Sequence, residues 1–324
     1  MNPCTPVRFL FLMDPVASID IAADSTFVMM LEAQERGHEI LYAHPRLLRQ
    51  HGGEPRITAC PIELRRVVGD HFTLGPERGL SLSECDAVFM RKDPPFDVAF
   101  LTYTYILDRV DRRRTVLFND PQGLRDFNEK LSALHWPELM PPTLVSADRH
   151  AIRAFIEEHG EAVVKPLDGA GGAGVIRLEH GDKNTGSVLD MLTLEGTRHI
   201  ETQAFLRDVV AGDKRVILLD GEPIGAINRI PAADDIRANM HVGGRAERSA
   251  ITERDREIAA ALAPELRRRG LILAGIDVIG GFLTEINVTS PTGLQEANRF
   301  DETRLEALIV DRVEEKRRAL DEPG

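Results

Sequence analysis

Apolar and mixed segments alternate along the first 120 residues and predict a regular succession of strands and helices. The strands predicted from short apolar runs are Val7–Met13, Glu39–Ala43, Asp86–Met90 and Thr115–Asn119. Helical spacing extends from Ser25, as N-cap, to Gly37, and again over Phe96–Val110. This alternation predicts an α/β fold with a mostly parallel sheet, whose carboxyl edge is where ligands dock. The segments Met13–Pro15 and Met90–Pro95 leave that edge, either as ligand loops or as simple proline turns.

After Pro121 the pattern becomes shorter and richer in strands. Helical segments are predicted over Asn128–Leu134 and Ala151–His159. The strands predicted here are Ala162–Pro166, Val175–Leu178, His199–Gln203, Lys214–Leu219 and Pro223–Ile230. The dipeptide Asp220-Gly221 predicts a tight hairpin turn. Residues 230–245 lack periodicity and carry charge, glycine and alanine, which is typical of a mobile lid.

A helix is predicted over Thr252–Arg269, and the chain then forms a last hairpin from Leu273–Ile279 and Phe282–Val288. On the second strand Glu285 and Asn287 share a face, because side chains alternate along a strand. The loop length decides whether Asp277 joins them. A two-residue loop pairs Asp277 with Thr284, whereas a three-residue loop pairs it with Glu285. We expect the three-residue loop, Gly280–Phe282.

If these three side chains share a face, they offer two carboxylates and an amide. Such oxygen ligands suit Mg²⁺, which also retains some water. The alternative is that the acidic residues merely form the solvated face of the sheet.

Composition narrows the class of protein. The 324 residues correspond to two or three domains, and 43% hydrophobic with 28% charged residues indicates an ordinary globular chain. A formal charge of −12 argues against nucleic-acid binding. The apolar run Val7–Met13 is too short for a signal peptide or a membrane span, and the three cysteines form no close pair, so we expect a cytoplasmic protein without a membrane partner.

A glycine-rich loop carries the clearest chemical signal. Residues 169–174 (GAGGAG) match GxGxxG, but a strand follows them instead of the helix that a dinucleotide fingerprint requires. An NAD-dependent enzyme is therefore disfavoured. Between two strands, Gly169, Gly171 and Gly172 can form a flap whose backbone N–H groups cover a polyphosphate; the alternative is a flexible turn. Lys165 would direct a cation at the same anion, or would simply be solvated. Together, the glycine flap, Lys165 and the possible metal site indicate ATP-dependent chemistry on a small substrate.

Longer blocks carry a resemblance that covers nearly the whole chain. The blocks are MDPVASIDIAADSTFVMMLEAQERG, MRKDPPFD, TYILDR, NDPQGLRDFNEK, VVKPLDGAGGAGVIR, GDKRVILLDGEPIGAINRIP, RANMHVGGR and LTEINVTSPTG. In this order they resemble the ATP-grasp ligases, and within them the prokaryotic glutathione synthetase family. The resemblance implies an N-terminal α/β substrate domain (1–122), a central ATP-grasp subdomain with the flap (123–200) and a C-terminal subdomain with metal site and lid (201–324). It also implies ligation of γ-glutamylcysteine to glycine through an acyl phosphate.

The resemblance further implies a role for individual residues. ATP would be bound by Lys130, Lys165, Gly169, Gly171, Gly172, Gln203, Phe205, Leu206 and Asp213. Two Mg²⁺ ions, or Mn²⁺, would be held by Asp277, Glu285 and Asn287. Arg215 and Arg229 would face the transferred phosphoryl group as catalytic residues. Substrate would be bound by Arg91, Arg237, Thr289 and Ser290. A homo-oligomer, dimer or tetramer, is also implied.

Two segments depart from the family pattern. Residues 203–206 are QAFL where an Asn-Tyr pair can occur, and residues 294–298 are LQEAN in place of an Arg-Glu-Ile type of run. We expect the second change to touch the acyl-substrate or glycine pocket. Two alternatives stay open beside glutathione synthesis: another ATP-grasp carboxylate–amine ligase, such as a D-alanine–D-alanine or glutamate-adding enzyme, and a non-catalytic nucleotide-binding protein of the same fold.

Overall fold

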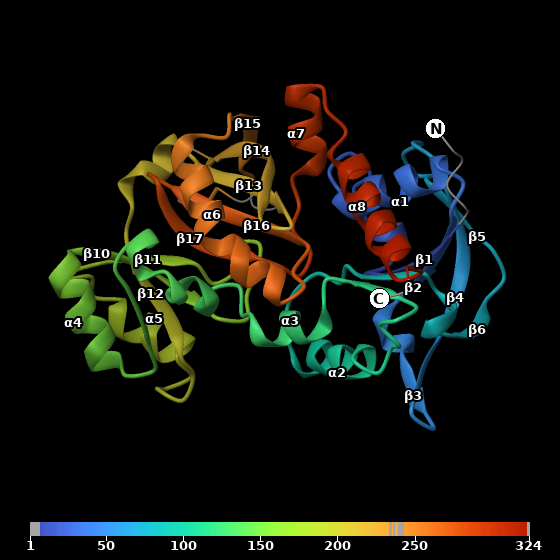
Figure 1. Cartoon of the computed structure of the whole chain (residues 1–324). Coiled ribbons are helices and arrows are strands. Elements are labelled where there is room, and N and C mark those ends of the chain that lie inside the picture. Colours follow the sequence, from blue (N-terminus) through green and yellow to red (C-terminus); the bar gives the residue numbers. More distant parts are fainter. Residues whose placement is uncertain (1–6, 233–234, 236, 239–242, 323–324) are drawn as a thin grey trace.

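The computed structural model describes all residues except 1–6, 233–234, 236, 239–242 and 323–324, and arranges them around three sheets (Figure 1). The first is an eight-stranded sheet of order β3-β4-β2-β1-β7-β8, with β5 and β6 paired to β4. Its strands are β1 Arg8–Leu12, β2 Glu39–Ala43, β3 Arg49–His51, β4 Glu54–Leu64, β5 Phe72–Leu74, β6 Arg78–Ser81, β7 Ala87–Met90 and β8 Val116–Phe118. Strands β1, β2, β7 and β8 pair in parallel, as predicted, whereas β3 to β6 form an antiparallel extension that was not predicted.

Helices α1 (Ser25–Glu35) and α2 (Val98–Leu107) follow β1 and β7, and α3 (Pro121–Asp126) follows β8. The N-cap of α1 is Asp24, whose carboxylate accepts a hydrogen bond from the backbone N–H of Phe27, so the predicted cap at Ser25 was one residue late. The core of this sheet is aromatic, with Phe11 stacked on Phe89 at a centroid distance of 4.3 Å. That packing fixes the strands whose carboxyl ends approach the site.

The second sheet is four-stranded and antiparallel, in the order β11-β10-β12-β9. Its elements are β9 Thr143–Ser146, α4 Arg149–His159, β10 Glu161–Pro166, β11 Ile176–Glu179, α5 Thr185–Leu192 and β12 Ile200–Ala204. The helix predicted over 128–134 is instead a 3-10 turn, η4 (Leu131–His135), because the Asn128 side chain accepts the N–H groups of Lys130 and Leu131 and organises a turn there.

The third sheet has five antiparallel strands in the order β15-β14-β13-β16-β17. Its elements are β13 Asp213–Leu219, β14 Glu222–Ile230, β15 Arg245–Arg248, α6 Glu253–Arg268, β16 Leu273–Ile279 and β17 Phe282–Asn287. The predicted turn at Asp220-Gly221 joins β13 to β14 with φ of 48° and 81°. Glycine is required at the second position, where a Cβ would lie 2.5 Å from that of Ala263.

The hairpin β16–β17 corrects the predicted loop. Ile279 pairs with Phe282, so the loop has two residues, Gly280 and Gly281. The register then shifts between Asp277 and Val278, and this bulge makes Glu285 the partner of Asp277. The expected pairing of the two carboxylates is therefore correct, but it arises from an extra residue on β17 and not from a longer loop.

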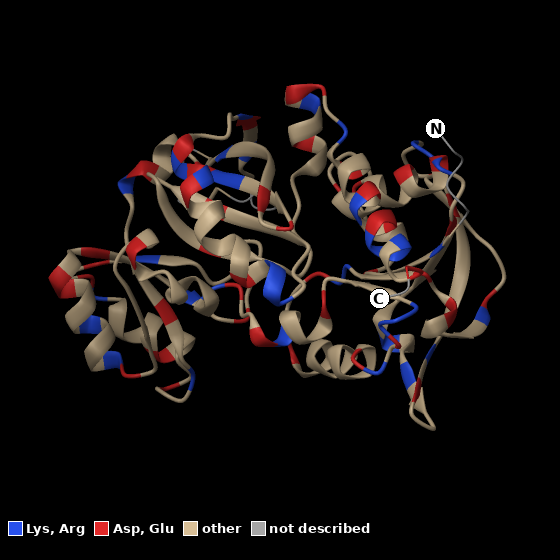
Figure 2. Cartoon of the chain, in the orientation of Figure 1, with Lys and Arg blue, Asp and Glu red and all other residues tan. Residues whose placement is uncertain are grey.

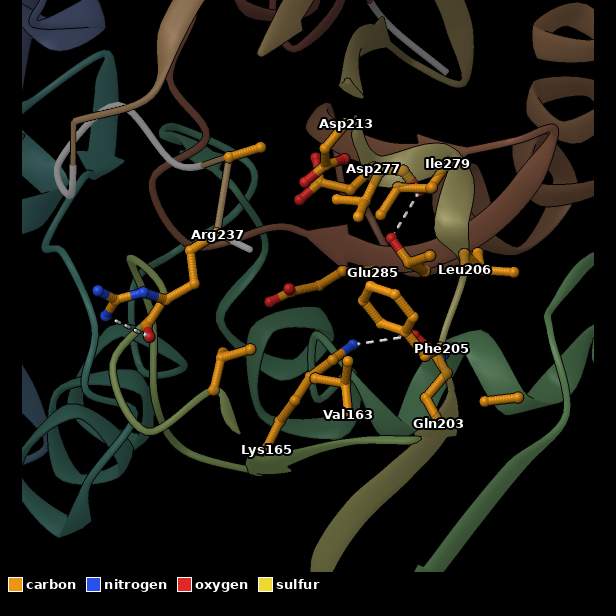
Figure 3. A pocket seen from close by; sticks show the side chains of 16 residues that line it. Val163, Lys165, Gln203, Phe205, Leu206, Asp213, Arg237, Asp277, Ile279 and Glu285 are labelled. Carbon is orange, nitrogen blue, oxygen red and sulfur yellow. Dashed lines mark hydrogen bonds between the residues drawn. The ribbon is translucent and has the colours of Figure 1, made fainter. Parts of the chain in front are cut away.

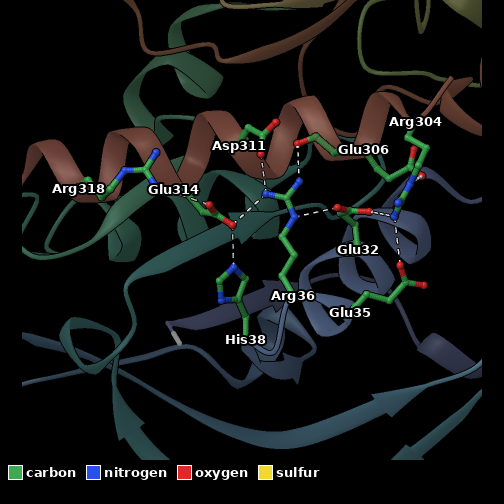
Figure 4. A network of polar contacts seen from close by, with 10 residues as sticks. Glu32, Glu35, Arg36, His38, Arg304, Glu306, Asp311, Glu314 and Arg318 are labelled. Atoms are coloured by element: carbon green, nitrogen blue, oxygen red, sulfur yellow. Dashed lines mark hydrogen bonds and ion pairs between the residues drawn. The ribbon is translucent and has the colours of Figure 1, made fainter. Parts of the chain in front are cut away.

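The C-terminal helices return to the first sheet. Helix α7 (Leu294–Asp301) leads into α8 (Leu305–Ala319), which packs on α1. Acidic and basic residues intermix along α8 (Figure 2), and their side chains form a polar network with α1 (Figure 4). Glu314 on α8 accepts hydrogen bonds from Arg36 at 3.0 Å and meets Nε2 of the buried His38 at 2.9 Å. The division at residues 122 and 200 stays a prediction, and α8 belongs by packing to the first sheet.

Short 3-10 turns complete the described secondary structure: η1 Val16–Ser18, η2 Pro45–Leu47, η3 Leu82–Glu84, η5 Pro137–Leu139 and η6 Arg207–Ala211. The Asn119 side chain at the end of β8 donates to the carbonyls of Leu273 and Val288, which fastens the first sheet to the third at 2.8 Å in both cases. Across the described residues, no helix has both the length and the apolar character needed to cross a bilayer.

Candidate active site

Two adjoining cavities lie where the three sheets meet. The first is bordered by β10 and the segment after β12 on one side and by β16 and β17 on the other. The second lies between the glycine loop, the strands β13, β14, β16 and β17, and the turn 289–292. Both are lined by Gly172, Val175, Asp277 and Glu285, so they form one continuous space. Every predicted site residue except Arg91 lines one or both of them.

The first cavity has an apolar end. Val163, Phe205, Leu206 and Ile279 point into it from two different sheets (Figure 3). Walls of this kind suit a flat heterocyclic ring, which gains from burial on both faces. The change to QAFL therefore keeps an apolar surface at the connector.

Lys165 lies between this apolar end and the polar centre. It is buried on β10, opposite Glu201 of β12 in register, and its Nζ lies 3.1 Å from a carboxylate oxygen of Glu201. The same Nζ donates to Oε1 of Gln203 at 3.0 Å (Figure 3). Lys165 is thus a held cation at the cavity wall, and not the solvated residue that the alternative assumed.

The polar centre is a row of charged residues across the third sheet. Arg215 on β13 is the partner of Asp277 on β16, which is the partner of Glu285 on β17. Arg215 donates to both carboxylate oxygens of Asp277, through Nε at 2.6 Å and Nη2 at 3.1 Å. Such a bidentate pair fixes both side chains.

Arg229 reaches the same centre from β14. Its Nη2 lies 2.7 Å from the partly buried Asp213 and 2.9 Å from the buried Asp277, so one guanidinium serves two carboxylates. Burial alone would raise the pKa of Asp277, but Arg215 and Arg229 outweigh it and hold that pKa at about 2. Burial and the charge of Asp277 raise the pKa of Asp213 to about 6, against the effect of Arg229.

Lys130 connects the glycine loop to the charged row. Its buried Nζ donates to the backbone carbonyl of Gly169 at 2.7 Å and to Glu285 at 3.2 Å. Burial would lower the pKa of Lys130, but the charges of Glu285 and Glu129 raise it, so the side chain is a cation.

The glycine loop joins β10 directly to β11, as predicted for a flap. Gly171 and Gly172 have φ of 64° and 82°, a region that favours glycine, and they line the second cavity together with Gly169. At Gly174 a Cβ would lie 2.7 Å from the ring of Pro166. The loop therefore depends on glycine both for its turn and for its close approach to β10.

Asp277, Glu285 and Asn287 meet at one edge of the second cavity, where Asn287 Nδ2 donates to Asp277 at 3.2 Å. Two carboxylates and an amide oxygen fit Mg²⁺ or Mn²⁺, provided that phosphate oxygens and water complete the shell. Within the described residues no cluster of three His, Cys, Asp or Glu side chains could bind a metal alone. The donors present therefore suit a metal that arrives with a phosphorylated ligand.

The turn after β17 supplies Thr289 and Ser290 to the second cavity. It is held by Glu129, a residue that the sequence analysis missed. Oε1 of the partly buried Glu129 accepts from the N–H groups of Val288 (2.8 Å) and Thr289 (3.0 Å) and from the Thr289 hydroxyl (2.9 Å). Burial and the charge of Glu285 raise the pKa of Glu129. Its position beside Lys130 in the NEK block was the signal that could have identified it.

Arg91 does not line the described cavities. It lies buried behind the turn, where Nε donates to the Thr26 hydroxyl and Nη2 to the carbonyl of Pro291, both at 3.0 Å. Burial lowers the pKa of Arg91 to about 10. Arg91 therefore supports the turn and makes no direct lining contact, which differs from its predicted position toward the substrate.

The LQEAN segment also lies away from the cavities. It starts α7, where Gln295 Nε2 donates to the carbonyls of Ile21 and Asp24, in the segment that precedes α1 beside the first sheet. The segment therefore joins two parts of the fold and lines neither of the two cavities, and the expected effect of this departure on the substrate pocket stays a prediction.

The predicted lid, residues 230–245, lies partly outside the described residues. Within its described part, Arg237 lines the first cavity and donates through Nη1 to the carbonyl of Gly172 at 3.4 Å. Arg237 also pairs with Asp235 at 2.7 Å. This segment thus contacts the glycine loop across the cavity (Figure 3).

The fold and the paired cavities define an ATP-grasp ligase. Solved structures with this fold include D-cycloserine synthetase DcsG, with a TM-score of 0.65 at 19% identity over 94% of this chain and 99% of that one. Another is the macrocyclase MdnC from Microcystis aeruginosa, with a TM-score of 0.63 at 14% identity over 94% and 99%.

Sequence comparison identifies the family within that class. Residues 7–125 match the N-terminal domain of prokaryotic glutathione synthetase, and residues 129–302 match its ATP-grasp domain. Glutathione synthetase of Brucella melitensis is 47% identical over 94% of this chain and 97% of its own, and that of Synechococcus elongatus is 47% identical over 91% and 94%. The chain therefore belongs to the prokaryotic glutathione synthetase family, and the predicted resemblance is confirmed.

Proposed function

We propose that the two cavities form one active site in which γ-glutamylcysteine and glycine are joined to give glutathione. ATP-dependent glutathione synthesis is the activity of the family to which the chain belongs. The observation that carries the assignment to this site is the charged row Arg215–Asp277–Glu285, which separates an apolar slot from a polar cavity. The sequence of apolar slot, charged row and polar cavity fits a nucleotide that lies across the row, with its base in the apolar slot and its phosphates toward the polar cavity, where γ-glutamylcysteine and glycine would bind.

The reaction requires no nucleophile from the protein. The C-terminal carboxylate of γ-glutamylcysteine takes the γ-phosphoryl group of ATP, so that ADP leaves and an acyl phosphate forms. The amine of glycine, having lost one proton, attacks the acyl carbon; the C–N bond forms, the C–O bond breaks, inorganic phosphate leaves, and the nitrogen gives up a second proton to become the amide. Catalysis then depends on positioning and on stabilising charge.

The residues divide naturally between the ligands. The apolar end beside Phe205 and Leu206 would take the adenine, and Asp213 the ribose. Lys130 and Lys165 would bind phosphate oxygens from opposite walls, and the N–H groups of the glycine loop would cover them. Each lysine is already held by hydrogen bonds, so little order is lost when a phosphate binds.

Asp277, Glu285 and Asn287 would hold the metal ions. A bound Mg²⁺ would neutralise charge on the phosphates and align the transferred group. In the structure Arg215 and Arg229 neutralise Asp277, and Lys130 neutralises Glu285. Ligand binding must therefore redistribute these partners, which would release guanidinium donors toward the transferred phosphoryl group.

The acyl phosphate has to be protected from water. Arg237 already bridges the lid segment to Gly172 of the flap, and this contact supports closure of the two over the bound nucleotide. We also propose a cytoplasmic setting, which accords with the free cysteines Cys60 and Cys85. A homodimer or homotetramer is proposed from the family resemblance, and light scattering of the purified chain tests it.

The function is tested by ADP release from purified protein with ATP and Mg²⁺. Turnover should require γ-glutamylcysteine and glycine together, and each alone should give only background. D-Alanine and glutamate serve as alternative acceptors. Activity with another acid–amine pair, but not with this one, would keep the reaction class and reject the substrates; ATP binding without turnover with every pair would favour a non-catalytic protein.

A further inference from the structure

A third cavity opens from the side of the second. The two share Pro94, Glu129, Gly169 and Thr289, so the passage between them lies at these residues. The rest of the third cavity is contributed mainly by α3, the segment after it and the base of the glycine loop. It is thus attached to the reaction centre but is separate from the apolar slot of the first cavity.

The third cavity is lined by apolar residues and by charged residues of both signs. The apolar residues are Phe96, Leu124, Phe127 and Leu167. Arg125 is the cationic group of the lining, whereas Glu129 lies at the passage as an anionic group, and Asp168 adds a second carboxylate from the loop side. Charged groups of opposite sign in a small, partly apolar space can bind a zwitterion.

Glu129 presents one occupied and one open oxygen. All three of its hydrogen bonds from Val288 and Thr289 meet Oε1. Among the described residues no donor meets Oε2. The Thr289 hydroxyl gives its proton to Oε1, so its own lone pairs are free to accept another donor. Glu129 and Thr289 together therefore offer acceptors for an ammonium group at the passage.

Arg125 presents the complementary donor. It forms an ion pair with Asp108 through Nη2, and its guanidinium lies 4.5 Å from the centroid of the Tyr105 ring. These contacts hold the side chain in place. Its Nη1 is buried and has no hydrogen-bond partner among the described residues. A buried guanidinium nitrogen without an acceptor is costly, so an acceptor oxygen of a ligand in the third cavity would remove this cost.

We propose that this third cavity is the binding subsite of the acceptor amino acid. The ammonium group of the amino acid would lie at Glu129 and Thr289, and its carboxylate at Arg125. The proposal rests on the function proposed above and names the subsite for the second substrate. The orientation favours glycine over the γ-glutamyl end of the other substrate, which is also a zwitterion. Glycine must turn its amine toward the acyl phosphate, and Glu129 lies on the side that faces the second cavity.

The test compares Michaelis constants for the three substrates in Glu129→Gln and Arg125→Gln. Glutamine keeps an oxygen acceptor for the turn but removes the charge that binds an ammonium. Loss of one charged hydrogen bond should raise KM for glycine about 10- to 100-fold in each variant. KM for ATP and for γ-glutamylcysteine should stay within about threefold.

Arg112→Gln is the matched control for Arg125. Arg112 also pairs with Asp108, at 3.1 Å, but lies on the surface outside the cavity. It should leave all three constants unchanged. If Arg125→Gln does not fold, Arg125→Lys replaces it as the test. Lysine retains the positive charge but lacks the paired donors of a guanidinium, so KM for glycine should rise, but by less than the rise of about 10- to 100-fold expected for Arg125→Gln.

A different pattern of constants would overturn the proposal. A rise in KM for γ-glutamylcysteine alone would place the γ-glutamyl end in this cavity. Equal changes in all three constants, or none, would indicate that Glu129 and Arg125 only support the fold. Glycinamide, which lacks the carboxylate, gives a further check. Its KM should already be high with the wild-type enzyme, and Arg125→Gln should raise that KM little further.

Trapping the acyl phosphate separates this proposal from the function it depends on. Hydroxylamine, ATP and γ-glutamylcysteine without glycine should yield a hydroxamate with the wild-type protein. The Glu129→Gln variant should form it at a similar rate, because hydroxylamine is neutral near pH 7 and carries no ammonium group for Glu129 to bind. Failure in the wild type would reject the proposed function, whereas trapping by wild type and variant together with unchanged KM for glycine would reject the subsite alone.

Discussion

The active site and the α1–α8 interface both bury many charges, but they use them differently. At the interface, carboxylates and guanidinium groups from two helices meet and join the ends of the chain (Figure 4). In the site, Lys165 (Figure 3), Arg215 and Arg229 are paired with carboxylates around the two cavities. Charges at the interface stabilise the fold, whereas charges around the cavities are positioned for ligands. Substitutions in the site should therefore lower activity more than stability, whereas substitutions at the α1–α8 interface should lower stability more than activity.

The largest effect is expected from Arg229→Ala or Lys165→Ala. Each removes a fixed cation that would stabilise transferred charge, so turnover should fall about 10²- to 10³-fold. Steady-state kinetics at saturating substrates measure this loss, and thermal melting shows whether the variant is folded. Turnover close to the wild-type value in a folded variant would reject the assignment.

Metal dependence gives the next effect. Chelation should abolish activity, and Glu285→Gln should raise the Mg²⁺ concentration for half-maximal rate by at least about tenfold, because an anionic oxygen ligand is lost. The same substitution removes the partner of Lys130. Titration of the rate with Mg²⁺ and with Mn²⁺ checks the prediction, and an unchanged metal requirement would contradict it.

Glu314→Gln tests the other region. It removes the charge that accepts from Arg36 and meets His38, and we expect a loss of about 1–3 kcal/mol in the free energy of unfolding. Turnover of the folded variant should be unchanged, since the interface lies outside the cavities. Urea denaturation measures the first quantity. A fall in turnover without a shift in the urea midpoint would reverse the comparison.

The smallest effect concerns pH. Burial would raise the pKa of Glu314, but hydrogen bonds from His38 and Arg36 outweigh it and lower that pKa in the folded protein. Its contribution to stability is therefore complete above the unfolded pKa and is lost as the pH falls through the folded pKa. The stability gap between wild type and Glu314→Gln should narrow as the pH falls from neutral to acid in urea titrations. A gap that widens toward acid would contradict the assignment.

Local patterns predicted much of the fold. The exact bounds of Glu39–Ala43 and Leu273–Ile279, and the turn at Asp220-Gly221, follow from short apolar runs and from turn chemistry. Strand β4 was missed because Pro55 and Pro61 interrupt an otherwise alternating pattern. The β16–β17 bulge could not be predicted, since the register depends on how the sheet packs and not on the loop.

The site was predicted in outline for a related reason. Lys130, Lys165 and Asp277 belong to long family blocks, so their residue types carried a signal. Arg125 and Glu129 lie in one of the same blocks but among several other charged residues, and their importance appears only when the third cavity brings them together. Arg91 shows the converse: its block was informative, but its side chain turns behind the site to hold Pro291.

The return of α8 to α1 has a consequence for synthesis on the ribosome. The first sheet and α1 leave the exit tunnel before the second and third sheets, and α8, the helix that covers α1, follows only after them. Until α8 has emerged, the apolar surface that Ile309 and Val313 cover has no partner. The packing of α1 can therefore be completed only after the other two sheets have been synthesised.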